Sequence, residues 1–220
     1  MALIAKDDGG GDFPICPEGQ NQAVCVQIID LGTQHNVHYD KYQRKVLLGI
    51  ELPTVLNKEN DNKPFLIWNR YTLNLGEKAN LRRDLETWRG QAFTEDELLG
   101  FDLKRVLGAP CYVSVVHNTK GDKTYANINS IIKLPKEIPA AKPHSSLIYF
   151  DLEEPDMGAW VTFSEHLQKT ICASPEAEAA GLSVGCETLS PPDQSDKTDT
   201  YIPDGSDGPY TPINEDDIPF

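Results

Sequence analysis

Residues 81–133, LRRDLETWRGQAFTEDELLGFDLKRVLGAPCYVSVVHNTKGDKTYANINSIIK, contain the two changes of hydrophobic period that decide the fold. The first half places apolar residues three and four positions apart, a spacing that predicts short helices. Thr94, followed by Glu97 three residues later, is the signature of a capping box at a helix start. Two runs typical of strands follow, residues 110–117 and 123–133, and the turn NTKGD separates them. The stretch therefore predicts a helical insert and then a β-hairpin.

Three further runs on the N-terminal side also read as strands. They are QAVCVQIIDLG at 22–32, RKVLLGIE at 44–51 and PFLIWNRYTLNL at 64–75. Three strands, a helical insert and a hairpin is the element order of the OB-fold, a small five-stranded Greek-key barrel. We therefore predict a mainly β protein whose folded part is a five-stranded OB-fold barrel with a helical insert between strands 3 and 4.

The flanks of this domain differ from it in composition. Prolines at 135, 139 and 143 predict a linker, and 163–173 predicts a short helix, whereas LSPPDQSDKTDTYIPDGSDGPYTP at 189–212 is typical of a disordered tether. We predict a flexible N-terminal segment at 1–20 and an OB-fold domain at 21–140. A linker with a short helix follows at 141–175, and a disordered acidic tail with a docking tip occupies 176–220.

The formal charge of −14 is confined to the last third of the chain. Residues 1–142 hold 18 basic and 18 acidic side chains, whereas residues 143–220 hold 2 and 16. Between 24 and 136 the balance is 16 basic to 13 acidic, so overall acidity does not exclude nucleic-acid binding by the front domain. No apolar run approaches 18 residues, and the five cysteines form no CxxC pair; residues 1–12 hold no long apolar stretch, so we expect no signal peptide. We expect reduced thiols in a cytoplasmic protein without a membrane segment.

Basic and aromatic residues alternate in the predicted strands and the first loop. In a single-stranded nucleic-acid groove, cations neutralise phosphates and rings stack on bases. Trp68 fits a core position as well as a stacking platform, whereas Trp88, following Leu81 and Leu85, is better explained as a core residue of its helix. The candidate DNA-binding residues are Tyr39, Lys41, Tyr42, Arg44, Trp68, Arg70, Lys123 and Tyr125.

Catalytic motifs are absent from the sequence. It has no Walker-type loop, no Gly-x-Ser-x-Gly elbow and no His-Glu-x-x-His pair. His35, His38 and Asp40 have a spacing that suits a metal, but their loop offers no obvious further ligand. We therefore expect a protein that is not an enzyme and has no cofactor and no metal.

The chain closes with EDDIPF, three carboxylates before an apolar tip, at residues 215–220. A partner needs only an apolar pocket and nearby Lys or Arg side chains to hold such a peptide. An acidic solubilising tail is the simpler alternative, but it has no need of the Pro-Phe ending. The predicted partner-docking residues are Asp216, Asp217, Ile218, Pro219 and Phe220.

Two resemblances agree with these expectations. The EDDIPF ending resembles the C-terminal peptide of bacterial single-stranded-DNA-binding proteins. The run 81–136, with Trp88-Arg89-Gly90, Leu107-Gly108-x-Pro110-Cys111 and Tyr125-Ala126-Asn127-Ile128, resembles phage-encoded OB-fold proteins taken to bind single-stranded DNA. The first resemblance implies docking on replication and repair proteins such as helicases, primases, exonucleases or polymerase subunits. The second implies a bacterial host cytoplasm, and it assigns no binding residue.

The sequence thus predicts a sequence-tolerant single-stranded-DNA-binding protein of DNA replication, recombination and repair, which coats strands and recruits enzymes through its tip. One alternative is an OB-fold protein-interaction module of the replication or recombination machinery with weak or no DNA binding. Another is an inhibitor whose acidic tail mimics nucleic acid, which explains the charge but not the apolar tip. The oligomeric state stays open, a homo-oligomer included.

Overall fold

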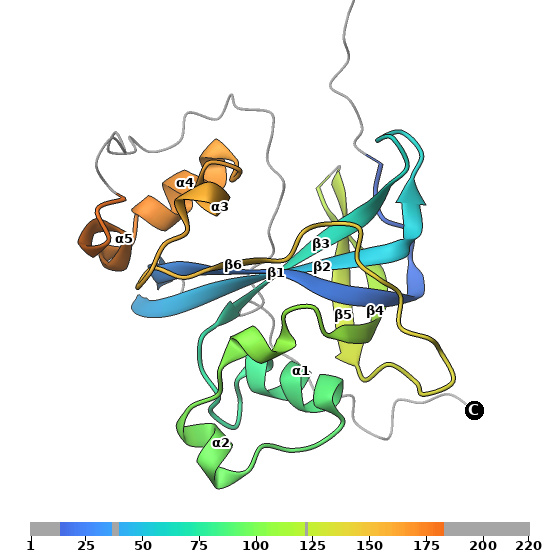
Figure 1. The fold of residues 1–220 in the computed structure, drawn as a ribbon, viewed down its shortest axis with the longest axis horizontal. Coiled ribbons are helices and arrows are strands. Elements are labelled where there is room, and N and C mark those ends of the chain that lie inside the picture. The colour runs from blue at the N-terminus through green and yellow to red at the C-terminus, as the bar shows by residue number, and fades with distance from the viewer. Residues whose placement is uncertain (1–13, 37–39, 122, 183–220) are drawn as a thin grey trace, which may run out of the picture.

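The computed structural model describes residues 14–36, 40–121 and 123–182, and over these ranges the protein is mainly β with a few helices (Figure 1). That class agrees with the sequence prediction. In chain order the elements are β1 Gly19–Asn36, β2 Lys41–Asn57, β3 Lys63–Thr72, α1 Asn80–Arg89, α2 Glu95–Leu99, the 3-10 helix η1 Leu103–Val106, β4 Pro110–Lys120, β5 Lys123–Ile132, β6 Ile148–Phe150, α3 Met157–Trp160, α4 Glu165–Cys172 and α5 Pro175–Ala179.

One six-stranded sheet contains all of these strands. Its order is β3-β2-β1-β4-β5, and β6 pairs with β1 off this path. The long β1 strand pairs antiparallel with β2 along most of its length, antiparallel with β4 at residues 19–24, and parallel with β6 at residues 27–29. β1 therefore joins the β2–β3 hairpin and the β4–β5 hairpin into one sheet.

The sheet differs from the predicted barrel in strand number and closure. Helices α1, α2 and η1 lie between β3 and β4, as predicted, and β3 approaches β5, with α-carbons within 8 Å. Within the described residues, however, no hydrogen-bonded ladder joins β3 to β5, so the sheet is open, and it has six strands rather than five. The sixth strand, β6, is only three residues long and follows the predicted domain end at 140.

One face of the sheet, which we call the α1 face, packs against helix α1. Alternation along β2 places Val46, Leu48 and Ile50 on this face. Leu81, Leu85 and Trp88 of α1 complete the same buried cluster, and Trp88 is only 5% exposed. Trp88 is thus the core residue that its helical spacing predicts. Capping residue Thr94 accepts a hydrogen bond from the Glu97 N–H, so the predicted capping box is confirmed at the start of α2.

The opposite face, which we call the α4 face, is buried by the C-terminal elements. Ile29 and Leu31 of β1 and Leu47 of β2 lie in a second cluster with Phe150 of β6 and Ile171 of α4. Figure 1 shows α1 and α2 on one side of the strands and the orange helices α3, α4 and α5 on the other. The sheet is therefore a layer between two helical groups.

The C-terminal cover contains more structure than the sequence predicts. The short helix expected at 163–173 is present as α4, but β6 and α3 also lie in the range assigned to a linker, and α5 lies within 176–220 apart from its first residue. A three-residue strand and helices of four or five residues are too short to show a hydrophobic period. The rest of the predicted tail, from residue 183, lies outside the described residues.

Candidate nucleic-acid interface

The end of the β1–β2 hairpin presents an exposed aromatic ring beside a cation, as predicted. Tyr42 is 74% exposed, and its ring centroid lies 4.7 Å from that of His35. His35 in turn contacts Asp40, with Nε2 and Oδ1 2.9 Å apart. Lys41 is exposed next to Tyr42, whereas Tyr39 lies outside the described residues. This hairpin end can offer a ring for stacking and an ammonium for a phosphate.

Arg44 lies on the same hairpin, but it is held in an ion pair. Its guanidinium NH2 is 2.6 Å from Oδ2 of Asp30, and its Nε is 3.2 Å from the same oxygen. The hydrogen bond to Asp30 raises the pKa of Arg44, although partial burial opposes the rise. The charge of Arg44 is therefore compensated within the protein, and a phosphate would have to compete with Asp30 for it.

Trp68 and Arg70 lie on the α4 face of β3. In the β2–β3 register Trp68 is opposite Gly49 and Arg70 is opposite Leu47, which belongs to the α4-face core. A Cβ at Gly49 would lie 2.8 Å from Cζ3 of Trp68, so the ring lies close over the glycine. Trp68 also packs on the cluster around Phe150. The structure therefore gives Trp68 a packing role on a face covered by the C-terminal elements.

The β4–β5 hairpin carries the last two candidates. Lys123 is exposed and Tyr125 is half-buried. Ala126 and Ile128 of the same strand pack against the α1-face core, so Tyr125 projects from the other face of β5. This alternation is the one that the sequence predicts.

The candidate residues with described positions thus occupy three places. Lys41 and Tyr42 are at the β1–β2 hairpin end, Trp68 and Arg70 are on the covered α4 face, and Lys123 and Tyr125 are on the β4–β5 hairpin. Arg44 of β2 is held apart in its ion pair with Asp30. The predicted docking residues Asp216, Asp217, Ile218, Pro219 and Phe220 all lie outside the described residues.

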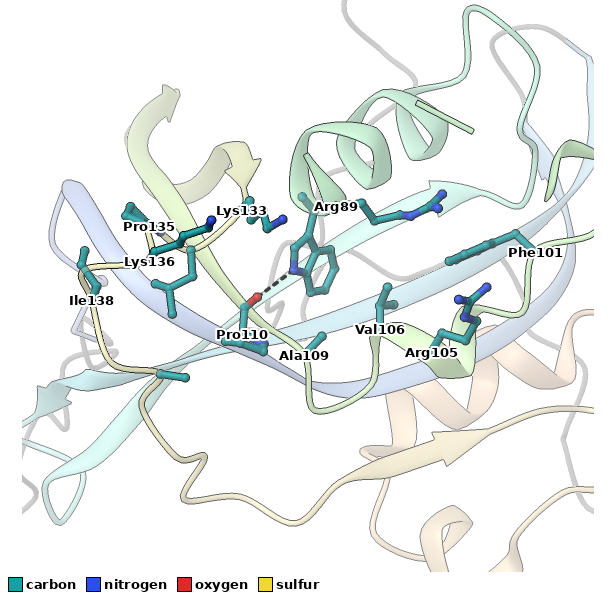
Figure 2. A pocket seen from close by; sticks show the side chains of 13 residues that line it. Arg89, Phe101, Arg105, Val106, Ala109, Pro110, Lys133, Pro135, Lys136 and Ile138 are labelled. Atoms are coloured by element: carbon teal, nitrogen blue, oxygen red, sulfur yellow. Dashed lines mark hydrogen bonds between the residues drawn. The ribbon is translucent and has the colours of Figure 1, made fainter. Parts of the chain in front are cut away.

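A cavity of about 430 Å³ lies beside the C-terminal end of α1, away from these candidates in sequence. Figure 2 shows Lys133 and Lys136 on one side of it and Arg89, Phe101 and Arg105 on the other. The wall between these cations is apolar. Its lining consists of Trp88, Arg89, Phe101, Arg105, Val106, Ala109, Pro110, Lys133, Leu134, Pro135, Lys136, Ile138 and Ala140.

Hydrogen bonds fix the frame of this cavity. The Trp88 indole N–H donates to the Pro110 carbonyl at 3.0 Å, the contact dashed in Figure 2. The Lys133 N–H donates to the Thr87 carbonyl at 3.1 Å, and the Thr87 hydroxyl donates to the Ile131 carbonyl at 2.7 Å. The exit of β5 is thereby tied to the last turn of α1. The Trp88 and Lys133 sides of the cavity are therefore fixed by the fold, and the irregular segment 134–140 after β5 completes its lining.

The two arginines of the cavity are held by aromatic rings. Arg89 lies 4.5 Å from the Phe93 ring centroid and 5.2 Å from that of Phe101, and its NH2 is 2.5 Å from Oε1 of Glu97. Arg105 lies 5.4 Å from the Phe101 centroid. Cation–π contacts of this kind keep a guanidinium in place without neutralising its charge. Glu97 does compensate the charge of Arg89, with which it forms an ion pair. Sequence reasoning missed this site because its residues come from 88–89, 101–110 and 133–140, which only the fold brings together.

Comparison of the sequence with models of protein families and with curated proteins finds no match. In the described part of the chain, no helix has the length and apolar character needed to cross a membrane.

Proposed function

We propose that this protein binds single-stranded DNA with little sequence preference. The observation that carries the proposal is the strand order: β1 pairs with both β2 and β4, the helices separate β3 from β4, and β3 approaches β5. This strand order supports an OB-type connectivity, although no hydrogen-bonded ladder joins β3 to β5 within the described residues. OB-folds bind oligonucleotides with the face of strands 2 and 3 and with the loops between strands 1 and 2 and strands 4 and 5.

The two hairpin ends supply the chemistry of the proposed interface. Lys41 and Tyr42 with Tyr39 form one contact region, and Lys123 with Tyr125 forms the other. Each combines a cation for phosphates with a ring for bases, as sequence-tolerant binding requires. The strand would follow these hairpins rather than the middle of the α4 face, since β6 and the C-terminal helices cover that face.

The double variant Tyr39→Ala/Tyr42→Ala tests the interface. Loss of stacked bases, worth about 1 to 3 kcal/mol each, predicts oligo-dT affinity reduced about fivefold or more, with an unchanged melting temperature because Tyr42 is exposed. A titration of labelled oligo-dT at two salt concentrations measures the affinity. It also yields the negative salt slope expected from phosphate contacts.

Tyr201→Ala/Tyr210→Ala is the matched control, because it removes two tyrosines outside the proposed interface. We expect its affinity to equal that of the wild type. Equal affinities for both double variants, or binding that does not change with salt, would contradict the interface.

Recruitment through the tip is the second part of the proposal. The segment 215–220 joins three acidic residues to Ile-Pro-Phe, which suits an apolar pocket with basic neighbours on a helicase, primase, exonuclease or polymerase subunit. Deleting Phe220 should abolish capture of such enzymes from a host lysate and leave oligo-dT affinity unchanged. Equal capture of these enzymes by the intact protein and by the Phe220 deletion variant would mean that the segment has only a solubilising role.

The cover on the α4 face favours one alternative, an OB-type module that binds proteins of the replication or recombination machinery rather than DNA. It covers part of the face of strands 2 and 3 that OB-folds use for oligonucleotides. The same oligo-dT titration separates the two functions, since the module would show no salt-dependent binding.

A further inference from the structure

The cavity beside α1 combines a strong positive rim with an aliphatic floor. Lys133, Lys136, Arg89 and Arg105 surround it, whereas Val106 and Ile138 are among the residues of its floor. A ligand that fits must carry several negative charges next to an apolar group of side-chain size. Two classes of macromolecule offer negative charge here, a DNA strand and an acidic peptide.

The aromatic residues of the cavity decide between these classes. Phe101 is already engaged by both guanidinium groups and by the Phe93 ring, whose centroid lies 5.1 Å away. Trp88 is only 5% exposed and uses its N–H for the Pro110 carbonyl. Neither ring offers a free face to a base, and base stacking is a main source of affinity for single strands. The open part of the floor is aliphatic, which suits the side chains of a peptide.

We infer that this cavity is a docking site for residues 215–220 of the same chain, Glu-Asp-Asp-Ile-Pro-Phe. Ile218 and Phe220 supply the apolar groups for the floor, and the three preceding carboxylates face the basic rim. Charge complementarity supports this occupant, since the rim has three cations besides Arg89, which is paired with Glu97, and the segment has three carboxylates. The inference concerns a site apart from the hairpin ends, and it does not depend on DNA binding.

The connection between the folded domain and the segment 215–220 is long enough for the segment to reach the cavity. The 32 residues between Leu182 and Glu215 reach at most about 110 Å when fully extended, which exceeds the dimensions expected for a domain of this size. Tethering also raises the effective concentration of the segment at the cavity to about the millimolar range, above that of segments from other copies in a dilute solution. The same chain is therefore the favoured source.

Photo-cross-linking in the full-length protein tests the inference. With Phe220→benzoylphenylalanine, irradiation should link position 220 to cavity residues such as Pro110 or Ile138, as identified by mass spectrometry. Tyr210→benzoylphenylalanine, which places the probe before the acidic residues, should give few of these links. Their yield should not change on dilution, because the segment and the cavity belong to one chain.

A charge reversal at the rim shows whether the cavity itself is recognised. Lys133→Glu/Lys136→Glu changes two exposed side chains and should reduce the cavity links about tenfold or more, since charge-assisted contacts are lost and repulsion is added. Lys58→Glu/Lys63→Glu, at the exposed β2–β3 hairpin end, makes the same change in net charge and should leave the yield within about twofold. Circular dichroism checks that both variants stay folded.

Three results would overturn the inference. Links from position 220 that fall mainly on the β1–β2 or β4–β5 hairpin would place the segment elsewhere. A yield that rises in proportion to protein concentration would assign the site to other copies. Links from an iododeoxyuridine-labelled oligo-dT to the cavity residues, together with loss of the links from position 220, would assign the cavity to DNA instead.

Discussion

The α1 face and the α4 face of the sheet are both buried, but they are buried by different parts of the chain. The α1 face is covered mainly by α1, which follows β3 directly and belongs to the same continuous run of elements as the strands. The α4 face is covered by elements that return from residues 148–182, including a strand that runs parallel to β1. Elements far along the chain thus turn the α4 face into a second core.

The two faces also differ in what holds their covers. On the α1 face, the Tyr71 hydroxyl donates to Oδ2 of Asp84 on α1 at 2.9 Å. On the other side, Glu51 is fully buried, and its carboxylate accepts the N–H groups of His144 and Ser145 on the segment that leads to β6. Glu176 of α5 accepts the N–H and hydroxyl of Thr33. Carboxylate hydrogen bonds therefore tie the C-terminal cover to β1 and β2.

The largest effect is expected on the α1 face, for Trp88→Ala. Removing this 5%-exposed indole leaves a large void and frees the Pro110 carbonyl, which predicts a loss of about 3 to 5 kcal/mol in unfolding free energy. Urea unfolding followed by circular dichroism measures the loss. A change below about 1 kcal/mol would show that α1 contributes little to the core.

The next effect concerns the contact between β1 and the C-terminal cover, through Gly32→Ala. Gly32 has a φ of +67°, and a Cβ there would lie 2.2 Å from Oγ of Ser174. Strain and overlap together predict a loss of about 2 to 4 kcal/mol. Hydrogen exchange should show the amides of α4 and α5 losing protection before those of α1. Uniform loss over both faces would contradict a separately attached cover.

Trp68→Ala distinguishes packing from DNA binding on the α4 face. Because the ring is partly buried over Gly49, its removal should cost about 2 kcal/mol of stability. Oligo-dT affinity should change less than twofold, unlike that of the hairpin variant. A loss of affinity without a loss of stability would instead make Trp68 a stacking platform and would require the cover to move.

The sequence predicts the α1 side of the fold well because its signals are local. Alternation in β2 and the spacing of Leu81, Leu85 and Trp88 are readable within one element, as is the capping box at Thr94. The α4 side depends on β6, three residues that pair with a strand more than a hundred residues earlier. No local period records that pairing, so the range appears as a linker.

The candidate site could be predicted only in part, for the same reason. Exposure of Lys41 and Tyr42 follows from their polar loop, whereas the ion pair of Arg44 with Asp30 and the partial burial of Trp68 depend on tertiary contacts. The cavity beside α1 needs three distant segments to meet. Composition identifies which residues carry charge, but only the fold shows which of those charges are already compensated.

The smallest effect, and the one that separates the two faces by pH, is expected for Glu176→Gln. Burial opposes ionisation of Glu176, but the hydrogen bonds from Thr33 outweigh it and lower the pKa below the usual 4.5. A lowered folded-state pKa gives stability that is present above pH 4.5 and is lost as the pH falls through the folded value. Glutamine keeps the shape without the charge, so the variant should lose about 1 kcal/mol at pH 7, since the site is only partly buried.

Melting curves from pH 7 to pH 3 measure this effect against Glu178→Gln, which removes an exposed carboxylate from the same helix. The difference between wild type and Glu176→Gln should shrink as the pH falls, because protonation removes the same charge from the wild type. Glu178→Gln should follow the wild type at every pH. A difference that persists unchanged at pH 3 would mean that Glu176 stabilises α5 through shape alone. Its carboxylate would then not make the C-terminal cover more sensitive to acid than the α1 face.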